Sequence, residues 1–309
     1  MPRRILITGA SGFVGRHLRH ALAASCPDGE LFTAAFDLLD AAATRQAVRS
    51  ALPDACVHLA GVTTVGSARQ NPDQAWQVNL HGTLGLAQAV LAEAPGCRFL
   101  HVSSAEAYGA SFRSGLRLDE AAPLAPLNTY AATKAAADLA IGAMVADGLH
   151  AIRLRPFNHT GPGQADAFVV PAFARQLARI AAGLQPPVLR VGALDPARDF
   201  LDVRDVCAAY TACLLAPDAL LPPGTILNLA SGTPRRIGDV LTQMCRAAGI
   251  DAQIEIEAGR LRPSDMPIAY GDASLARETL AWSPKIPWQQ TLGDVLDDWR
   301  ARVAAGDGT

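Results

Sequence analysis

The chain has 309 residues, of which half are hydrophobic and 18% are charged, and its formal net charge at pH 7 is -2. This length suffices for one large or two modest domains with a buried core. The near-neutral charge gives no reason to expect nucleic acid or an anionic membrane as a partner. Six scattered cysteines without a Cys-x-x-Cys pair are typical of a reducing compartment. With no signal peptide and no apolar run of spanning length, we expect a cytoplasmic protein.

Strand-like and helical segments alternate through the first half of the chain. The predicted strands are 4–8, 31–36, 55–60, 98–103 and 151–155, and the predicted helices are 13–24, 76–93 and a stretch around Tyr130. Such alternation indicates βαβ units, and hence an α/β fold with a doubly wound parallel sheet.

The second half is less regular and is interrupted by clusters of proline and glycine. Short strands are predicted over 188–191, 226–229 and 253–256, and helices over 168–182, 203–215 and 237–248. This pattern predicts a smaller C-terminal substrate-binding lobe that is interleaved with the last strands of the sheet. We expect residues 1–160 plus about 200–230 in a dinucleotide-binding domain, and about 161–199 plus 231–305 in the lobe. Residues 305–309 are expected to be frayed.

Three glycines lie between the first strand and the first helix. Gly9 permits a tight turn, Gly12 allows the backbone to approach a pyrophosphate, and Gly15 allows close packing of the helix. The N-terminus of the helix attracts the same anion. The spacing is Gly-x-x-Gly-x-x-Gly, which differs from the standard dinucleotide fingerprint, but its place between strand and helix favours a Rossmann-type nucleotide site.

Asp37 lies about 20 residues beyond this turn, where an acid that binds the ribose is expected. Two interpretations stay open. Asp37 holds the ribose hydroxyls, which implies NAD, or the second strand is truncated and Asp37 ends a third strand beside the adenine. We favour the second interpretation. It leaves Arg16 as a possible phosphate contact, although a solvated helix charge is the preferred interpretation of Arg16.

Tyr130 and Lys134 lie four apart in an alanine-rich stretch that favours helix, so they share one face. The cation should lower the pKa of the phenol and so help it to exchange a proton with an alcohol or sugar oxygen. Alone, the spacing is weak evidence, because many surface helices carry such pairs. Ser104, at the end of a predicted central strand, is placed to bind a substrate oxygen beside Tyr130.

Together these motifs resemble the extended short-chain dehydrogenase/reductase superfamily over nearly the whole chain. The resemblance rests on the glycine turn, Leu59-Ala60-Gly61, Asn79, Ser104, Tyr130-x-x-x-Lys134 and Arg155-Pro156-Phe157-Asn158. The blocks 155–164 and 189–200, with Arg262-Pro263-Ser264-Asp265, resemble the GDP-mannose-derived branch, and within it the GDP-4-keto-6-deoxy-D-mannose reductases, or GDP-D-rhamnose synthases.

The resemblance implies a role for each matched residue. The catalytic set is Ser104, Tyr130 and Lys134, with Glu106 as a possible member. The residues implied to bind NAD or NADP are Gly9, Gly12, Phe13, Val14, Gly15, Asp37, Leu38, Leu59, Ala60, Gly61, Tyr130 and Lys134. Those implied to bind a nucleotide-diphosphate sugar, with GDP as the expected nucleotide, are Ser104, Asn158, Val170, Val191, Arg198 and Arg262. Guanidinium groups suit a diphosphate, although Asp199, Asp202 and Asp265 are alternative partners for the two arginines.

The expected reaction is NAD(P)H-dependent reduction of the C4 ketone of GDP-4-keto-6-deoxy-D-mannose. A nucleotide-sugar 4-epimerase and a GDP-mannose 4,6-dehydratase are alternatives, since dehydratases use a glutamate at the position of Glu106 as a base. A non-catalytic NADP-binding sensor is a remote alternative. His159 is interpreted as structural, and no metal site is predicted. A homodimer is expected by analogy, and the sequence leaves open NAD or NADP, and the configuration at C4.

Overall fold

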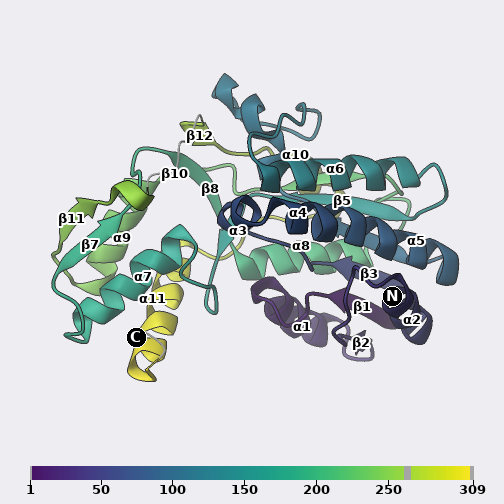
Figure 1. The fold of residues 1–309 in the computed structure, drawn as a ribbon, viewed down its shortest axis with the longest axis horizontal. Helices are drawn as coiled ribbons and strands as arrows, with labels where there is room; N and C mark the ends of the chain where they lie inside the picture. Colours follow the sequence, from purple (N-terminus) through teal and green to yellow (C-terminus); the bar gives the residue numbers. More distant parts are fainter. Residues whose placement is uncertain (1, 261–265, 307–309) are drawn as a thin grey trace.

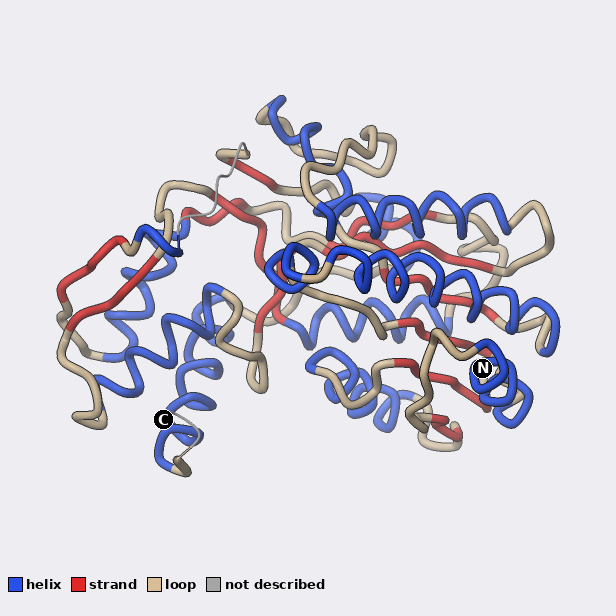
Figure 2. The backbone as a smooth tube through the Cα atoms, in the orientation of Figure 1, coloured by secondary structure: helices blue, strands red, loops and turns tan. Residues whose placement is uncertain are grey.

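A computed structural model describes residues 2–260 and 266–306. Its centre is a six-stranded sheet with the order β2-β1-β3-β4-β5-β9, in which every pair of neighbours is parallel (Figures 1 and 2). The strands are β1 (Arg4–Thr8), β2 (Glu30–Phe32), β3 (Ala55–His58), β4 (Arg98–Val102), β5 (Ala151–Pro156) and β9 (Ile226–Leu229). The predicted doubly wound Rossmann-type sheet is confirmed.

Alternating side chains of the strands bury both faces of this sheet. Ile5 and Ile7 of β1 belong to one hydrophobic cluster, whereas Leu6 between them belongs to another. The first cluster is covered by α1 (Phe13–Ser25) and α8 (Val203–Leu215), and the second by α2 (Ala41–Ala51), α5 (Thr83–Glu93) and α6 (Thr129–Met144). Because both faces are covered, the central strands consist almost entirely of buried residues.

The edge of the sheet beyond β1 differs from the prediction. One three-residue strand, β2, replaces the expected strand over 31–36, and the chain leaves the sheet at residue 33. Asp37 lies in the loop that follows, so its placement at the end of a third strand is wrong. Its side chain is exposed and accepts a hydrogen bond from the Leu39 backbone N–H at 2.9 Å. Leu38 beside it is buried.

The helix predicted to begin at Trp76 begins earlier. The helical run opens with α4 (Pro72–Trp76), continues as a π-helical segment, η1 (Gln77–Gly82), and ends with α5 at Glu93. Asn71 caps it by accepting from the Gln74 N–H, and Pro72 occupies the first turn, where no backbone donor is needed. Before it lies α3 (Val65–Gln70).

The C-terminal lobe is built around three amphipathic helices. Leu177 of α7 (Val169–Ala181), Leu241 of α9 (Ile237–Ala248) and Leu296 of α11 (Trp288–Ala304) are buried in one cluster. A parallel pair, β7 (Val188–Val191) and β11 (Gln253–Ile256), lies at its outer side (Figure 1). The predicted strands over 188–191, 226–229 and 253–256 and the helices over 203–215 and 237–248 are confirmed, whereas α11 was not predicted.

A small sheet connects the two lobes. β8 (Ala197–Asp202) pairs with β6 (Asn158–Thr160), β10 (Pro234–Arg236) and β12 (Ile268–Ala269). The remaining elements are η2 (Ala105–Ser114), η3 (Ala258–Arg260) and α10 (Ser274–Leu280). Ala273 and Trp282 belong to the core of the first lobe. We therefore propose that residues 266–282 belong to the dinucleotide-binding domain. The other predicted domain boundaries stay predictions.

Two surface properties accompany this fold. Among the described residues, no helix combines the length and the apolar character that a membrane crossing requires.

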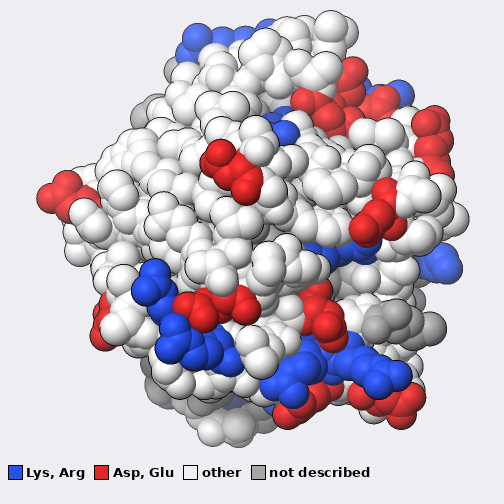
Figure 3. Space-filling model, turned by 90° about the vertical axis from the view of Figure 1, so that its right-hand side faces the viewer, with Lys and Arg blue, Asp and Glu red and all other residues white. Residues whose placement is uncertain are grey.

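Figure 3 shows the face at the end of the sheet away from the C-terminal lobe. Described basic and acidic side chains lie interspersed on this face, as the net charge of -2 would lead one to expect.

Candidate active site

Tyr130 and Ser104 meet above the carboxyl end of β4. Ser104 is the N-cap of η2 and accepts a hydrogen bond from the Glu106 N–H at 3.2 Å. Tyr130 lies in the first turn of α6, which begins there because Asn128 accepts from the Ala131 N–H at 2.9 Å. The hydroxyl groups of Tyr130 and Ser104 interact, and this interaction lowers the pKa of Tyr130. The structure therefore brings together the hydroxyl pair that the sequence predicted.

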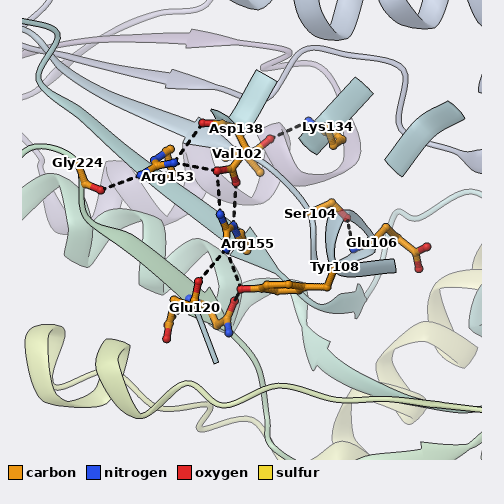
Figure 4. Close-up of polar contacts among 11 residues, drawn as sticks. Val102, Ser104, Glu106, Tyr108, Glu120, Lys134, Asp138, Arg153, Arg155 and Gly224 are labelled. Atoms are coloured by element: carbon orange, nitrogen blue, oxygen red, sulfur yellow. Dashed lines mark hydrogen bonds and ion pairs between the residues drawn. The ribbon is translucent and has the colours of Figure 1, made fainter. Parts of the chain in front are cut away.

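Lys134 lies one turn further along α6, on the same face as Tyr130. Its ammonium donates a hydrogen bond to the Val102 carbonyl oxygen at 2.7 Å, at the last residue of β4 (Figure 4). Burial lowers the pKa of Lys134 to about 8, and the charge of Asp138 acts in the opposite direction. The cation is thus fixed beside the strand end that also positions Ser104.

The pKa of Tyr130 differs from the prediction. Burial raises it to about 12, the hydrogen bond with Ser104 lowers it, and the charge of Glu106 raises it. The expected lowering by Lys134 is wrong for this structure, because the cost of burying a phenolate exceeds the favourable interactions. Tyr130 therefore holds its proton at neutral pH, which suits a proton donor.

A buried ion network, which was not predicted from the sequence, lies beneath the Tyr130 helix. Asp138 of α6 is fully buried and accepts from Arg155 Nε at 2.9 Å and Nη2 at 3.0 Å, and from Arg153 Nη1 at 3.2 Å. Both arginines lie on the same face of β5 (Figure 4). Two features of the sequence could have predicted this network: an acid four residues after Lys134, and two arginines inside a predicted central strand. Charges in such buried positions require partners.

Arg155 also reaches the segment that carries Ser104. Its Nη1 atom donates to the Tyr108 hydroxyl at 3.1 Å and to the Glu120 carbonyl at 3.2 Å. Tyr108 in turn donates to Asn228 Oδ1 at 2.7 Å. Since Tyr108 belongs to η2 and Asp138 to α6, one guanidinium holds the two elements that supply Ser104, Tyr130 and Lys134.

Glu106 and Arg198 approach the site from different lobes. Burial raises the pKa of Glu106, and the charge of Arg198 lowers it. Arg198, on β8, donates to the carbonyl oxygens of Ala197 at 2.8 Å and Met266 at 3.1 Å. The carboxylate of Asp199 accepts hydrogen bonds from the Ser231 and Gly232 backbone, and that of Asp202 accepts from Arg204 and Thr291. Neither acid has the predicted alternative role of a partner for Arg198 in these contacts.

The glycine turn forms a close-fitting backbone cradle. Gly9 has φ of 69°, and a Cβ there would lie 2.8 Å from the Ala60 nitrogen; a Cβ at Gly15 would lie 2.3 Å from the Gly9 oxygen. Gly12 caps α1 without a side chain, and the first turn, which begins with Phe13 and Val14, carries no acid. Gly9 and Gly15 have the local geometry expected of them, whereas the approach of Gly12 to a pyrophosphate stays a prediction. The backbone and helix end suit a pyrophosphate.

Asn79 connects the segment after β3 to the Tyr130 helix. Its side chain accepts from the Val62 N–H at 2.7 Å and donates to the Val62 carbonyl and to Thr133 Oγ1, each at 3.0 Å. Thr133 then donates to the Tyr130 carbonyl oxygen at 2.8 Å. Leu59, Ala60 and Gly61 precede this anchor directly after β3, so the segment expected to line the cofactor is held against α6.

Arg16 and His159 have contacts within the chain. Arg16 donates to the Ser11 carbonyl at 2.8 Å and to the Gly163 carbonyl at 3.0 Å, which links the glycine turn to the loop after β6. It is therefore more than the solvated charge that we favoured. The His159 ring stacks on Phe13, with 6.4 Å between centroids, and its Nδ1 lies 3.0 Å from the Phe157 oxygen. These contacts agree with a structural histidine.

The residues assigned to the substrate are distributed unevenly. Asn158 is exposed on β6. Val170 and Val191 are each 1% exposed inside the cluster of the C-terminal lobe, so contact with a ligand there would involve their backbone atoms. The predicted Arg262 and the motif around it lie outside the described residues.

Comparisons with known proteins give one family. The profile of the GDP-mannose 4,6 dehydratase family matches residues 23–295. The chain is 37% identical to the GDP-6-deoxy-D-mannose reductase of Pseudomonas aeruginosa, over 98% of this chain and 99% of that protein. It is 27% identical to GDP-mannose 4,6 dehydratase 1 of Arabidopsis thaliana, over 85% of this chain and 72% of that protein.

A solved structure supports the same relationship. RMD from Pseudomonas aeruginosa, complexed with NADPH, matches with a TM-score of 0.89 and 35% identity, covering 97% of this chain and 99% of that one. UDP-glucose 4-epimerase of Thermus thermophilus, in complex with NAD, matches with a TM-score of 0.82 and 26% identity, covering 96% and 99%. The chain therefore belongs to the GDP-mannose 4,6 dehydratase family of extended short-chain dehydrogenases/reductases.

Proposed function

We propose that this protein reduces the C4 ketone of GDP-4-keto-6-deoxy-D-mannose to GDP-D-rhamnose with NADH or NADPH. The observation that carries the proposal is the interacting Tyr130–Ser104 pair, with the half-buried ammonium of Lys134 fixed one helical turn away. The likeness to the reductase of Pseudomonas aeruginosa, which extends over nearly all of both chains, supports the substrate.

The glycine turn and the start of α1 fit a dinucleotide. Gly9 and Gly15 let the turn pack against the backbone of Ala60 and of Ala10, where a Cβ would clash, and the N-terminus of α1 attracts a pyrophosphate. Gly12, Phe13 and Val14 would complete the pyrophosphate site, while Asp37 and Leu38 would flank the adenine and residues 59–61 would line the cofactor. When bound, NAD(P)H supplies the hydride that the carbonyl carbon receives. Both cofactors stay in the proposal: one solved relative is complexed with NADPH and another with NAD.

Three side chains of this chain would perform the proton chemistry. Ser104 donates a hydrogen bond that orients the ketone oxygen. Tyr130, whose raised pKa keeps it protonated, gives its proton to that oxygen as the alcohol forms. Lys134 carries a positive charge near the phenol, which stabilises the negative charge that Tyr130 acquires.

The nucleotide diphosphate would lie between the lobes. Arg198 reaches this region from β8, and its charge is offset by Glu106 from the first lobe. Asn158 and Arg262 are proposed further ligands, with backbone contacts from Val170 and Val191. Two guanidinium groups suit a diphosphate because each forms charge-assisted hydrogen bonds in a planar fork.

Glu106 gives a specific reason to test the 4,6-dehydratase alternative. Burial raises the pKa of Glu106, and a raised pKa suits a carboxyl group that exchanges a proton with substrate in a dehydratase. Glu106 also lies only two residues after Ser104. A dehydratase would convert GDP-mannose to the keto sugar and leave the cofactor unchanged over the cycle. A 4-epimerase would likewise consume no cofactor.

The deciding experiment incubates the purified protein with GDP-4-keto-6-deoxy-D-mannose and either NADH or NADPH. We expect stoichiometric oxidation of one cofactor, and GDP-D-rhamnose as the product identified by NMR. GDP-mannose with NAD(P)+ and a UDP-hexose serve as parallel substrates. Release of water from GDP-mannose, or isomerisation of the UDP-hexose, without turnover of the keto sugar would contradict the reductase proposal.

We further propose a homodimer in the cytoplasm. The described cysteines form no disulfide and five of the six are buried, which fits a reducing compartment. Leu139, on the outer face of α6, is 60% exposed, as a helix that pairs with a second copy would require. Light scattering should give twice the monomer mass, and Leu139→Glu should convert the protein to a monomer. A monomeric wild type would contradict the dimer.

A further inference from the structure

A buried anion lies four residues beyond Lys134, on the same helix. Asp138 is fully buried and is held by Arg155 through two hydrogen bonds and by Arg153 through a third. Figure 4 shows its carboxylate directed to the two arginines beneath the strand end where Lys134 contacts the Val102 carbonyl. The helix places positions 134 and 138 on one face, about one turn apart.

Lys134 is surrounded mainly by neutral or cationic groups. His58 of β3 and His101 of β4 are buried, and the pKa of each is lowered by burial, to about 3 for His101. β5 contributes Arg153 and Arg155, and η1 contributes the neutral side chain of Asn79. Across the ligand side stand Tyr130, which keeps its proton, and Glu106 of η2. Asp138 is thus the buried anion that lies one helical turn from Lys134, and its charge acts on the ammonium.

We propose that Asp138 is a positioning residue that keeps Lys134 in its charged form, and that Arg153 and Arg155 serve to hold this carboxylate beneath the ammonium. The catalytic consequence for Tyr130 rests on the proposed function; the electrostatic coupling itself does not. Removal of the anion leaves a half-buried ammonium with only a neutral carbonyl as a fixed acceptor, so Lys134 should lose its proton at lower pH.

The composition of the chain makes this coupling measurable without substrate. Lys134 and Lys285 are its only lysines, and Lys285 is exposed. Protein labelled with 13C-lysine therefore gives two side-chain signals, which a Lys285→Arg variant assigns. We expect the Lys134 signal of the wild type to titrate near pH 8, and that of Asp138→Asn to titrate about one pH unit lower or more. Lys285 serves as the internal reference in every sample.

Two variants separate this effect from charge and from folding. Asp147→Asn removes an equal charge from an exposed position just beyond α6 and should leave both signals unchanged. If Asp138→Asn does not fold, the variant Asp138→Asn/Arg153→Gln retains the net charge and should show the same lowered titration. Asp138→Glu should titrate as the wild type does. Unchanged titration of Lys134 in a folded variant that lacks the Asp138 carboxylate would overturn the proposal.

The kinetic consequence provides a second readout. If the keto sugar is reduced, kcat should fall with rising pH as Lys134 loses its proton near pH 8, and in Asp138→Asn this alkaline limb should move to lower pH by the same interval as the NMR titration. A purely structural role would lower kcat equally at all pH values and leave the limb in place. Coupling seen by NMR in a protein that does not reduce the ketone would contradict only the proposed function.

Discussion

The two lobes are stabilised in different ways. Beneath the proposed catalytic residues, the first lobe holds buried charges: Asp138 and Arg155 are almost inaccessible, and their hydrogen bonds extend to Tyr108 and Asn228. The C-terminal lobe buries mainly aliphatic and aromatic side chains between α7, α9 and α11. Its charged group at the site, Arg198, is held by the main-chain carbonyls of Ala197, on its own strand, and of Met266.

The difference matches what each lobe has to do. Hydrogen bonds between charged groups have strict geometry, so the network fixes α6 relative to η2 and hence Tyr130 relative to Ser104. Apolar helix packing tolerates small rearrangements with less loss. We infer that the first lobe determines the rate of the chemical step, and that the second lobe determines how tightly the substrate binds. The variants below test this division, from the largest expected effect to the smallest.

Tyr130→Phe should have the largest effect on catalysis. The phenol is the proposed proton donor, and loss of general acid catalysis lowers rates about 10²- to 10⁴-fold. Cofactor affinity, measured by fluorescence titration, should change little because the ring is retained. Tyr210→Phe is a matched control, since the buried Tyr210 hydroxyl has no hydrogen-bond partner among the described residues. Activity of Tyr130→Phe close to that of the Tyr210 control would exclude Tyr130 as the acid.

Arg155→Met should give the largest loss of stability. Asp138 would remain buried with Arg153 as its remaining cation, and breaking a buried ion pair from one side costs about 3–5 kcal/mol. Because Tyr108 also loses its link through Arg155 to Asp138 of α6, kcat should fall more than KM rises. Chemical denaturation measures the first effect and steady-state kinetics the second. Arg19→Met, at an exposed position of α1, should stay within about 0.5 kcal/mol of the wild type.

Most of the first lobe could be predicted because its signals are local. β3, β4 and β5 are runs of buried residues, and the spacing of Tyr130 and Lys134 requires only a helix. The C-terminal lobe was harder. α11 was not predicted, because 11 of its 17 residues are polar or small and its apolar positions become a stripe only when α7 and α9 lie against them. β6, β10 and β12 have two or three residues each, too few to show alternation.

Contacts between distant segments account for the missed parts of the site. Arg155 was noted as part of a family motif, yet its partners Asp138 and Tyr108 come from two other elements. The raised pKa of Tyr130 was missed for a similar reason: the i, i+4 spacing shows the cation, but burial depends on the whole fold. Asp37 lies in a loop and not at a strand end, because β2 ends after three residues. An edge strand with a single neighbour can be this short.

Leu177→Ala tests the C-terminal lobe directly. Leu177 is fully buried between α7 and its neighbours, so the cavity should cost about 2–5 kcal/mol of stability. If the lobe mainly binds substrate, KM should rise. The value of kcat at saturating substrate should stay within about twofold of the wild type, because the barrier of the chemical step is unchanged. Leu184→Ala, at a 52% exposed site, is the control. A fall in kcat as large as that of Arg155→Met would contradict the proposed division between the lobes.

Arg198→Gln should have the smallest effect and the most selective one. The guanidinium is proposed to contact the diphosphate, and a hydrogen bond to a charged group contributes about 1.5–3 kcal/mol, or about 10- to 150-fold in KM. Tyr130 and Lys134 lie on another lobe, so kcat should be nearly unchanged. GDP alone should show the same loss of affinity by calorimetry, because the contact does not involve the reacting sugar carbon.

Glu106→Gln is the matched control for Arg198→Gln. It removes the opposing charge without removing a diphosphate ligand, so GDP should bind at least as tightly as to the wild type. Weaker GDP binding to Glu106→Gln, or unchanged binding to Arg198→Gln, would mean that Arg198 serves the packing of β8 against residue 266 and not the substrate.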